Sequence, residues 1–312
     1  QDGIDLTAGH FTGAVSGVGG NLRNTGQIFA GDDGIDINTS SVVTGAVVNS
    51  GRIEADSDGI HVSYAAQVQG GISNTATGVI QVGGDGIDVS WNGAQAQAIS
   101  NEGTITAAQS GIEVDSTAHI VGAISNSGSI TGDLASIFIE SGSSVGGGIS
   151  NSGTLTGPLK IDGDDGLGGG IDVVNSGTID IGASESFISG DYAQQAGGKF
   201  KLTLKNLTDY LAAPITIVGD AVLAGALDFS FVPAFNPIGG VRFTVFDIGG
   251  ARTGGFANQP QDALLGVFGT VSVYLDYLAE GNIDLYTVPE PDSFALLGVG
   301  AFAWRAGRRR LG

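Results

Sequence analysis

The sequence predicts an all-β protein in which a parallel β-helix of about 25 residues per coil precedes a smaller β domain and a short apolar C-terminal segment. Three observations support this fold class. An Asn-x-Gly motif recurs through the first 180 residues, the apolar residues between its copies alternate with small or polar ones, and residues 1–190 lack the period of a helix. Glycine, at 55 of 312 residues, suits the tight corners of such coils.

The Asn-x-Gly motif sets the length of one coil. Its Asn residues lie 24 to 27 positions apart, and one copy has two inserted residues before its Gly. A period in this range indicates stacked supersecondary units. In stacked coils the Asn side chains are expected to form a ladder whose amides hydrogen-bond along the axis. The residues are Asn24, Asn49, Asn74, Asn101, Asn126, Asn151 and Asn175.

Short strands are expected between these motifs. Each coil repeats apolar positions before the Asn, after the Gly and again near its third corner, as at Ile99, Ile105 and Ile112. Because these β-branched residues alternate with small or polar ones, we predict three short strands and three corners in each coil. Six residues before the Asn, Gln95 interrupts a position that is otherwise apolar. Residues 158–174 depart from the pattern and are expected to loop out.

The chain divides into three predicted regions. Residues 1–187 contain the β-helix repeats. In residues 188–288 the Asn-x-Gly motif is absent and longer alternating strands begin, with more aromatic residues. Such strands bury one face and suit either a small sandwich or a cap that closes the open end of a solenoid. Residues 289–312 form a tail of different composition.

The charge balance excludes one class of partner. The chain has 32 acidic and 12 basic residues, a net charge of −20 at pH 7. A nucleic-acid partner is excluded, because phosphate binding needs clustered Lys and Arg.

The absence of Cys excludes disulfides and thiolate metal sites. The chain begins at Gln1 and contains no Met, so we expect a fragment or a processed chain, with any signal peptide upstream.

Acidic residues recur at two positions of the repeat, three residues apart. His61 and Glu113 occupy the second of these positions in their own coils. Stacked coils bring such carboxylates to about 5 Å from one another, where they repel. A hard cation with oxygen ligands, such as Ca²⁺, relieves this repulsion, and side chains splayed into solvent are the alternative. The predicted calcium ligands are Asp33, Asp36, Asp58, Asp85 and Asp88.

Two aromatic residues share a repeat position beside the acidic residues. Tyr64 and Trp91 both follow a predicted strand. Aromatic faces next to polar groups bind sugar rings, so the pair is a candidate carbohydrate contact. Packing at the ends of the strands is the alternative.

Catalysis is not predicted. Many parallel β-helices are polysaccharide lyases or hydrolases, but the catalytic motifs of the polygalacturonase type are not assembled in this chain. The Gly-x-Ser-x-Gly pattern at residues 142–146 lies inside a coil, without the helix that a nucleophile elbow needs. A polysaccharide-active enzyme on the same fold is the alternative.

The tail combines three parts in a specific order. A Pro-Glu-Pro triplet precedes an uncharged, mostly apolar run at residues 293–304, and a cluster of Arg follows. This order resembles the PEP-CTERM sorting signal of Gram-negative bacteria. The apolar run spans only about 18 Å as a helix, so flanking residues have to extend it to cross a membrane. The predicted sorting and processing residues are Pro289, Glu290, Pro291, Arg308, Arg309 and Arg310.

The resemblances together imply a function. A PEP-CTERM signal implies an exported protein that is held transiently in the inner membrane until an exosortase-type enzyme processes it. The Ile-Ser-Asn-Ser-Gly-x-Ile strings resemble the β-helix passengers of bacterial autotransporters and surface adhesins. We therefore expect a structural or adhesive solenoid at the cell surface or in the extracellular matrix. The alternatives are a polysaccharide-active enzyme and a calcium-dependent carbohydrate-binding module, either of which has an extracellular polysaccharide as its partner.

Overall fold

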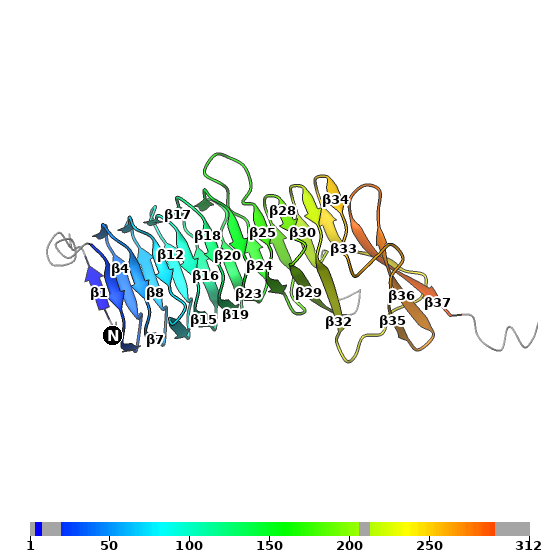
Figure 1. The fold of residues 1–312 in the computed structure, drawn as a ribbon, viewed down its shortest axis with the longest axis horizontal. Helices are drawn as coiled ribbons and strands as arrows, with labels where there is room; N and C mark the ends of the chain where they lie inside the picture. Colours follow the sequence, from blue (N-terminus) through cyan, green and yellow to red (C-terminus); the bar gives the residue numbers. More distant parts are fainter. Residues whose placement is uncertain (1–3, 8–19, 206–212, 291–312) are drawn as a thin grey trace, which may run out of the picture.

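The protein is an elongated stack of short strands that winds into one solenoid (Figure 1). The structure is a computed structural model that describes residues 4–7, 20–205 and 213–290. These residues contain strands and no helix. Four sheets run along the axis, three of which receive a strand from each coil of the repeat region and one of which receives a strand from only five of the coils. The predicted all-β solenoid, with coils about 25 residues apart, is confirmed.

Sheet I is the longest and passes from the solenoid into the C-terminal end of the fold. Its first ten strands are parallel and its last three are antiparallel. In sheet order they are β1 (Ile4–Thr7), β4 (Ile35–Asn38), β8 (Ile60–Ser63), β12 (Ile87–Ser90), β16 (Ser110–Val114), β20 (Ala135–Ile139), β24 (Leu159–Ile161), β27 (Ser186–Ile188), β30 (Ile215–Ile217), β33 (Arg242–Ile248), β37 (Ile283–Pro289), β36 (Val271–Tyr277) and β35 (Leu264–Phe268).

Sheets II and III complete the coils and are parallel throughout. Sheet II consists of β2 (Leu22–Asn24), β6 (Val47–Asn49), β10 (Ile72–Asn74), β14 (Ile99–Asn101), β18 (Ile124–Asn126), β22 (Ile149–Asn151), β25 (Val173–Asn175), β28 (Tyr192–Gln194), β31 (Ala221–Leu223) and β34 (Arg252–Gly254). Sheet III consists of β3 (Gln27–Ala30), β7 (Arg52–Ala55), β11 (Val79–Val82), β15 (Thr104–Ala107), β19 (Ser129–Gly132), β23 (Thr154–Thr156), β26 (Thr178–Asp180), β29 (Lys199–Leu204) and β32 (Ala226–Phe231).

A fourth strand in five of the coils was not predicted. These two-residue strands form sheet IV, whose members are β5 (Val42–Val43), β9 (Gln67–Val68), β13 (Gln95–Ala96), β17 (His119–Ile120) and β21 (Ser144–Val145). Their register also explains Gln95, because Ala96 and not Gln95 pairs with Val68 and Ile120. The apolar position is therefore kept, and the coil is one residue shorter before its Asn.

The Asn ladder that the repeat predicts is present. The Nδ2 atom of each repeat Asn donates to the Oδ1 atom of the Asn in the next coil at 2.8 Å. The series ends where Asn175 donates to Oε1 of Gln194, also at 2.8 Å. These amides are buried, so each hydrogen bond satisfies a polar group that water cannot reach.

The Gly of the motif permits the coils to approach one another. A Cβ atom at Gly128 would lie 2.1 Å from the carbonyl oxygen of Gly103 in the preceding coil. No side chain fits at that distance, so the position requires glycine. Inside the coils, Ile99, Ile124 and Ile149 stack in direct register and form one column of the core.

The parallel pairing continues past residue 187, where the sequence placed the end of the β-helix. Strands β27 to β34 add further rungs to sheets I, II and III, although the Asn-x-Gly motif is absent there. Main-chain hydrogen bonds hold these rungs and do not depend on the corner motif. The predicted boundary between residues 187 and 188 therefore marks a change of corner sequence within one continuous solenoid.

An antiparallel meander closes the C-terminal end. Strand β37 pairs with the last solenoid strand of sheet I, β33, and β36 and β35 follow it outward. Beside it, the rings of Phe231, Phe235 and Phe268 lie with their centroids 4.7 Å apart and cover apolar residues of the core. Of the two predicted arrangements, the structure shows the cap and not the sandwich. The meander therefore gives β33, the last parallel strand of sheet I, an antiparallel partner in place of a further coil.

One part of the repeat departs from the coil path. Strand β24 still pairs within sheet I, and the backbone of Asp164 and Asp172 still hydrogen-bonds to the preceding coil, so only residues 165–170 of the predicted loop leave the stack (Figure 1). A single parallel bridge between Ser144 and Asp164 connects this loop with the end of sheet IV.

Candidate functional site

The acidic residues of the repeat form a row on the outer side of sheet I. Asp36, His61, Asp88 and Glu113 pair in direct register on β4, β8, β12 and β16. Their neighbours along each strand point into the core, so this row faces outward. Asp36 and Asp88 are nevertheless only 7% and 8% exposed. The predicted register is confirmed, and the splayed, solvated alternative does not describe these two carboxylates.

The corner aspartates hold the main chain of the following coil. An Oδ1 atom of Asp33 accepts a hydrogen bond from the backbone N–H of Asp58 at 3.0 Å. Asp58 accepts in the same way from Asp85 at 2.7 Å, and Asp85 from Ser110 at 2.6 Å. These contacts give the repeated Asp a structural role, because each one satisfies a backbone donor at a corner.

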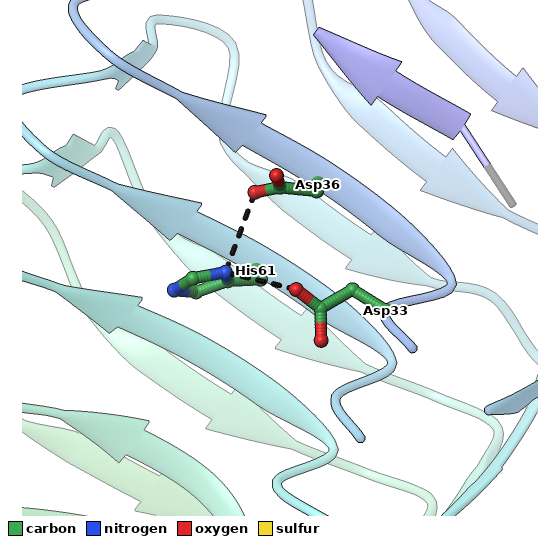
Figure 2. Close-up of side chains that lie close together, drawn as sticks. All are labelled: Asp33, Asp36 and His61. Carbon is green, nitrogen blue, oxygen red and sulfur yellow. Dashed lines mark hydrogen bonds and ion pairs between the residues drawn. The ribbon is translucent and has the colours of Figure 1, made fainter. Parts of the chain in front are cut away.

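His61 lies at the centre of this cluster (Figure 2). Its Nδ1 atom is 3.1 Å from Oδ2 of Asp33 and 3.3 Å from Oδ1 of Asp36. Its Nε2 atom is 3.2 Å from Oδ2 of Asp88. A neutral imidazole would direct a lone pair at one of these carboxylates, whereas an imidazolium donates from both nitrogens. The geometry therefore favours a positively charged ring between the carboxylates.

The electrostatics of the cluster agree with this assignment. Burial disfavours the charged ring, but hydrogen bonds to Asp33 and Asp36 and the charge of Asp88 raise the pKa of His61 to about 11. Burial raises the pKa of Asp58 to about 6 and the pKa of Glu113 to about 7. Burial also holds the pKa of Asp88 well above its ordinary range. The folded cluster thus retains protons that its separated groups would release.

The same atoms bear on the predicted calcium site. Ligand atoms of Asp33, Asp36 and His61 lie within 4.8 Å of one another, as do those of Asp58, His61 and Asp88. Calcium prefers six to eight oxygen ligands, so an imidazole in both groups does not favour it. Asp85 belongs to neither group. The imidazolium supplies the positive charge that the sequence assigned to calcium, and the calcium site stays a prediction.

The two aromatic residues lie at the corners that follow β8 and β12. The rings of Tyr64 and Trp91 are within 11° of parallel, and their centroids are 6.0 Å apart. Each residue is 49% exposed and has a positive φ, 52° for Tyr64 and 67° for Trp91. The rings therefore contact each other at the surface and keep about half of their area open to solvent.

The first two residues of the predicted processing triplet belong to the folded cap. Pro289 is the last residue of β37, and the backbone N–H of Glu290 donates to the carbonyl oxygen of Thr270 at 2.7 Å. The other predicted residues of the tail, Pro291 and Arg308 to Arg310, lie outside the described residues, as does the predicted membrane segment. None of the described residues belongs to a helix long and apolar enough to cross a membrane.

Sequence reasoning missed two residues of these sites. His61 was placed in the acidic row but was not assigned as its counter-ion, although its repeat position between Asp36 and Asp88 was a usable signal. Ser272, which donates to the carboxylate of Glu290, had no such signal, because the two residues meet only through the meander.

Comparison with known proteins identifies the tail. The family described as the PEP-CTERM protein-sorting motif matches residues 287–310. No curated protein and no solved structure matches the chain. The matched residues begin in β37 and include the triplet and the Arg cluster that the sequence indicated. The chain is thus a β-solenoid protein that carries a PEP-CTERM protein-sorting motif at residues 287–310, the signal of an exported protein processed by an exosortase-type enzyme.

Proposed function

We propose that this protein is a rigid structural or adhesive component of the bacterial surface or extracellular matrix. The observation that carries the proposal is the junction of a PEP-CTERM motif with an elongated solenoid (Figure 1). Solenoids build long side surfaces from contacts between neighbouring coils, and their sheets pair most backbone groups along the rod. Those properties suit a spacer or matrix element that has to resist proteolysis.

The charge distribution supports a transient membrane stage in a Gram-negative host. Without residues 289–312 the chain keeps 30 acidic and 8 basic residues, a net charge of −22. Positive residues beside an apolar segment are retained on the cytoplasmic side of a membrane. The Arg cluster at residues 305–310 therefore stays inside while the acidic solenoid lies outside. In this arrangement the Pro-Glu-Pro triplet lies near the outer face of the inner membrane, where the processing enzyme cuts.

The sorting route is tested by the mass of the mature protein. In a host with an exosortase, intact-mass analysis of the surface protein is expected to show a chain that ends near residue 291 and lacks the Arg cluster. Deletion of residues 289–312 is expected to divert the solenoid from the surface. As a matched control, Ser127→Ala alters an exposed residue of the solenoid and should leave delivery unchanged. Surface protein that still carries Arg308, together with normal delivery after the deletion, contradicts the proposal.

A carbohydrate contact is a second candidate function. The observation that favours it is the half-exposed, nearly parallel pair of Tyr64 and Trp91, beside the buried carboxylates of sheet I. Exposed aromatic rings lose little conformational freedom on binding and offer large apolar faces. A polysaccharide strand that lies across this corner would place sugar rings on them.

Binding to extracellular polysaccharide of the host tests this candidate. Double substitution Tyr64→Ala and Trp91→Ala is expected to weaken binding roughly tenfold. Ser116→Ala is the matched control, because Ser116 occupies the same corner position one coil further on. Equal binding by the double variant and the control removes the aromatic pair as a contact. Release of reducing ends or unsaturated products in the same incubation would instead support the polysaccharide-active enzyme.

A further inference from the structure

The beginning of the sorting motif is built into the fold. Thr287, the first matched residue, lies in β37 between β33 and β36. Its hydroxyl accepts a hydrogen bond from the backbone N–H of Val241 at 2.9 Å and donates to the carbonyl oxygen of Ile238 at 2.7 Å. The motif is therefore continuous with a strand that the cap needs.

Two further contacts hold the first two residues of the triplet, Pro289 and Glu290. The hydroxyl of Ser272 donates to a carboxylate oxygen of Glu290. Ser272 is only 1% exposed, whereas Glu290 is exposed, so the acidic side chain reaches back to a buried donor. Pro289 packs on Gly239, since a Cβ atom at Gly239 would lie 2.7 Å from the Cγ atom of Pro289. The chain is thus held on both sides of the peptide bond that joins Pro289 and Glu290.

We propose that the cap is a latch on its own sorting motif: Ser272 and Gly239 hold Glu290 and Pro289 against the fold, and the processing enzyme acts on the molecules in which this contact has opened. The inference rests on the proposed function, in which the enzyme cuts near the triplet. A segment paired in a sheet cannot lie in an enzyme groove at the same time. The apparent affinity of the enzyme is therefore reduced by the fraction of chains with a free triplet.

The latch also limits where the cut falls. A cut before Thr287 would remove a residue whose hydroxyl links β37 to residues 238–241. A cut after Glu290 leaves β37 and its partners in the mature protein. The contacts thus favour a mature chain that keeps its cap.

The rate of processing tests the latch. In a pulse-chase experiment in an exosortase host, Ser272→Ala removes the donor to Glu290 and is expected to speed the appearance of the processed mass about three- to tenfold. Gly239→Ala places a methyl group against Pro289 and is expected to act in the same direction through an independent contact. The matched control is Ser230→Ala, which loses a hydroxyl near the same end of the solenoid without contact to the motif.

The outcomes separate the latch from the proposed function. An unprocessed wild-type chain overturns the proposed function and the latch with it. Normal processing of the wild type, with unchanged or slower processing of both variants, overturns the latch alone. Hydrogen exchange in β33 and β36 shows whether each variant keeps its cap, and faster processing with a protected cap is the result that the latch requires.

Discussion

Replacing Ile124 with Asp is expected to unfold the solenoid around β18. Ile124 is fully buried between Ile99 and Ile149, so the substitution removes apolar contacts on both sides and places a carboxylate where no partner exists. A buried, unpaired charge costs several kcal/mol, and the loss of the isoleucine adds to this. We expect destabilisation of about 4 kcal/mol or more, measured by chemical denaturation and by hydrogen exchange in β14, β18 and β22.

The control for this prediction lies three residues away. Ser127→Asp introduces the same carboxylate into the same coil at an exposed corner, where a change within about 0.5 kcal/mol is expected. Solenoids unfold in units of a few coils. Hydrogen exchange therefore shows which strands lose stability, whereas the midpoint of a denaturation curve averages the effect over all coils. Equal losses of stability in the two variants would show that the register of the coil is not as described.

Replacing His61 with Gln is expected to produce the second large loss of stability. The substitution removes the positive charge between Asp33, Asp36 and Asp88 and leaves two buried carboxylates without a counter-ion. Breaking a buried ion pair from one side costs about 3–5 kcal/mol. Hydrogen exchange in β4, β8 and β12 should report the loss. His119→Gln is the control, since His119 contacts the hydroxyl of Ser144 and is expected to cost much less.

The charge of His61 also predicts that the stability of the solenoid falls as the pH rises. The pKa of His61 is raised from 6.5 to about 11 on folding, so its contribution is fully present below pH 6.5 and is lost as the pH rises toward 11. Between pH 7.5 and 9.5 the folded state holds about one proton more at this residue, and stability should fall by about 1.4 kcal/mol per pH unit. His61→Gln should lack this slope, while His119→Gln should keep it. A wild-type stability that is flat over this range contradicts a charged His61.

Calcium tests the same cluster in another way. If the acidic row binds Ca²⁺, millimolar calcium raises the unfolding temperature by linkage, and the double substitution Asp58→Asn and Asp85→Asn abolishes the increase. Both carboxylates also accept backbone hydrogen bonds, so the calcium-induced shift is the quantity to compare, and not the unfolding temperature itself. An imidazolium in the cluster competes with calcium and reduces the shift. No shift in the wild type, or the same shift in the double variant, removes the calcium site.

The period of the coils, the Asn ladder and the sorting motif could be predicted from the sequence because each is a local pattern. Asn126 and Gly128 have counterparts in the other coils of the first 180 residues, for reasons that one coil already contains: an amide that needs a partner and a corner that admits no Cβ. Stacking identical units then brings identical residues together, so periodicity alone places Asp36, His61 and Asp88 side by side. The tail is a contiguous stretch of residues and is equally local.

Only the tertiary structure decided the extent of the solenoid and the contacts of its sites. Parallel pairing beyond residue 187 depends on backbone hydrogen bonds, which leave no mark in the side-chain pattern once the corner motif changes. The charge of His61 depends on which atoms its ring faces, and register alone does not fix a side-chain rotamer. Ser272 and Glu290 meet because an antiparallel meander folds back on the last rung, and such a non-local contact forms only when the whole chain end is packed.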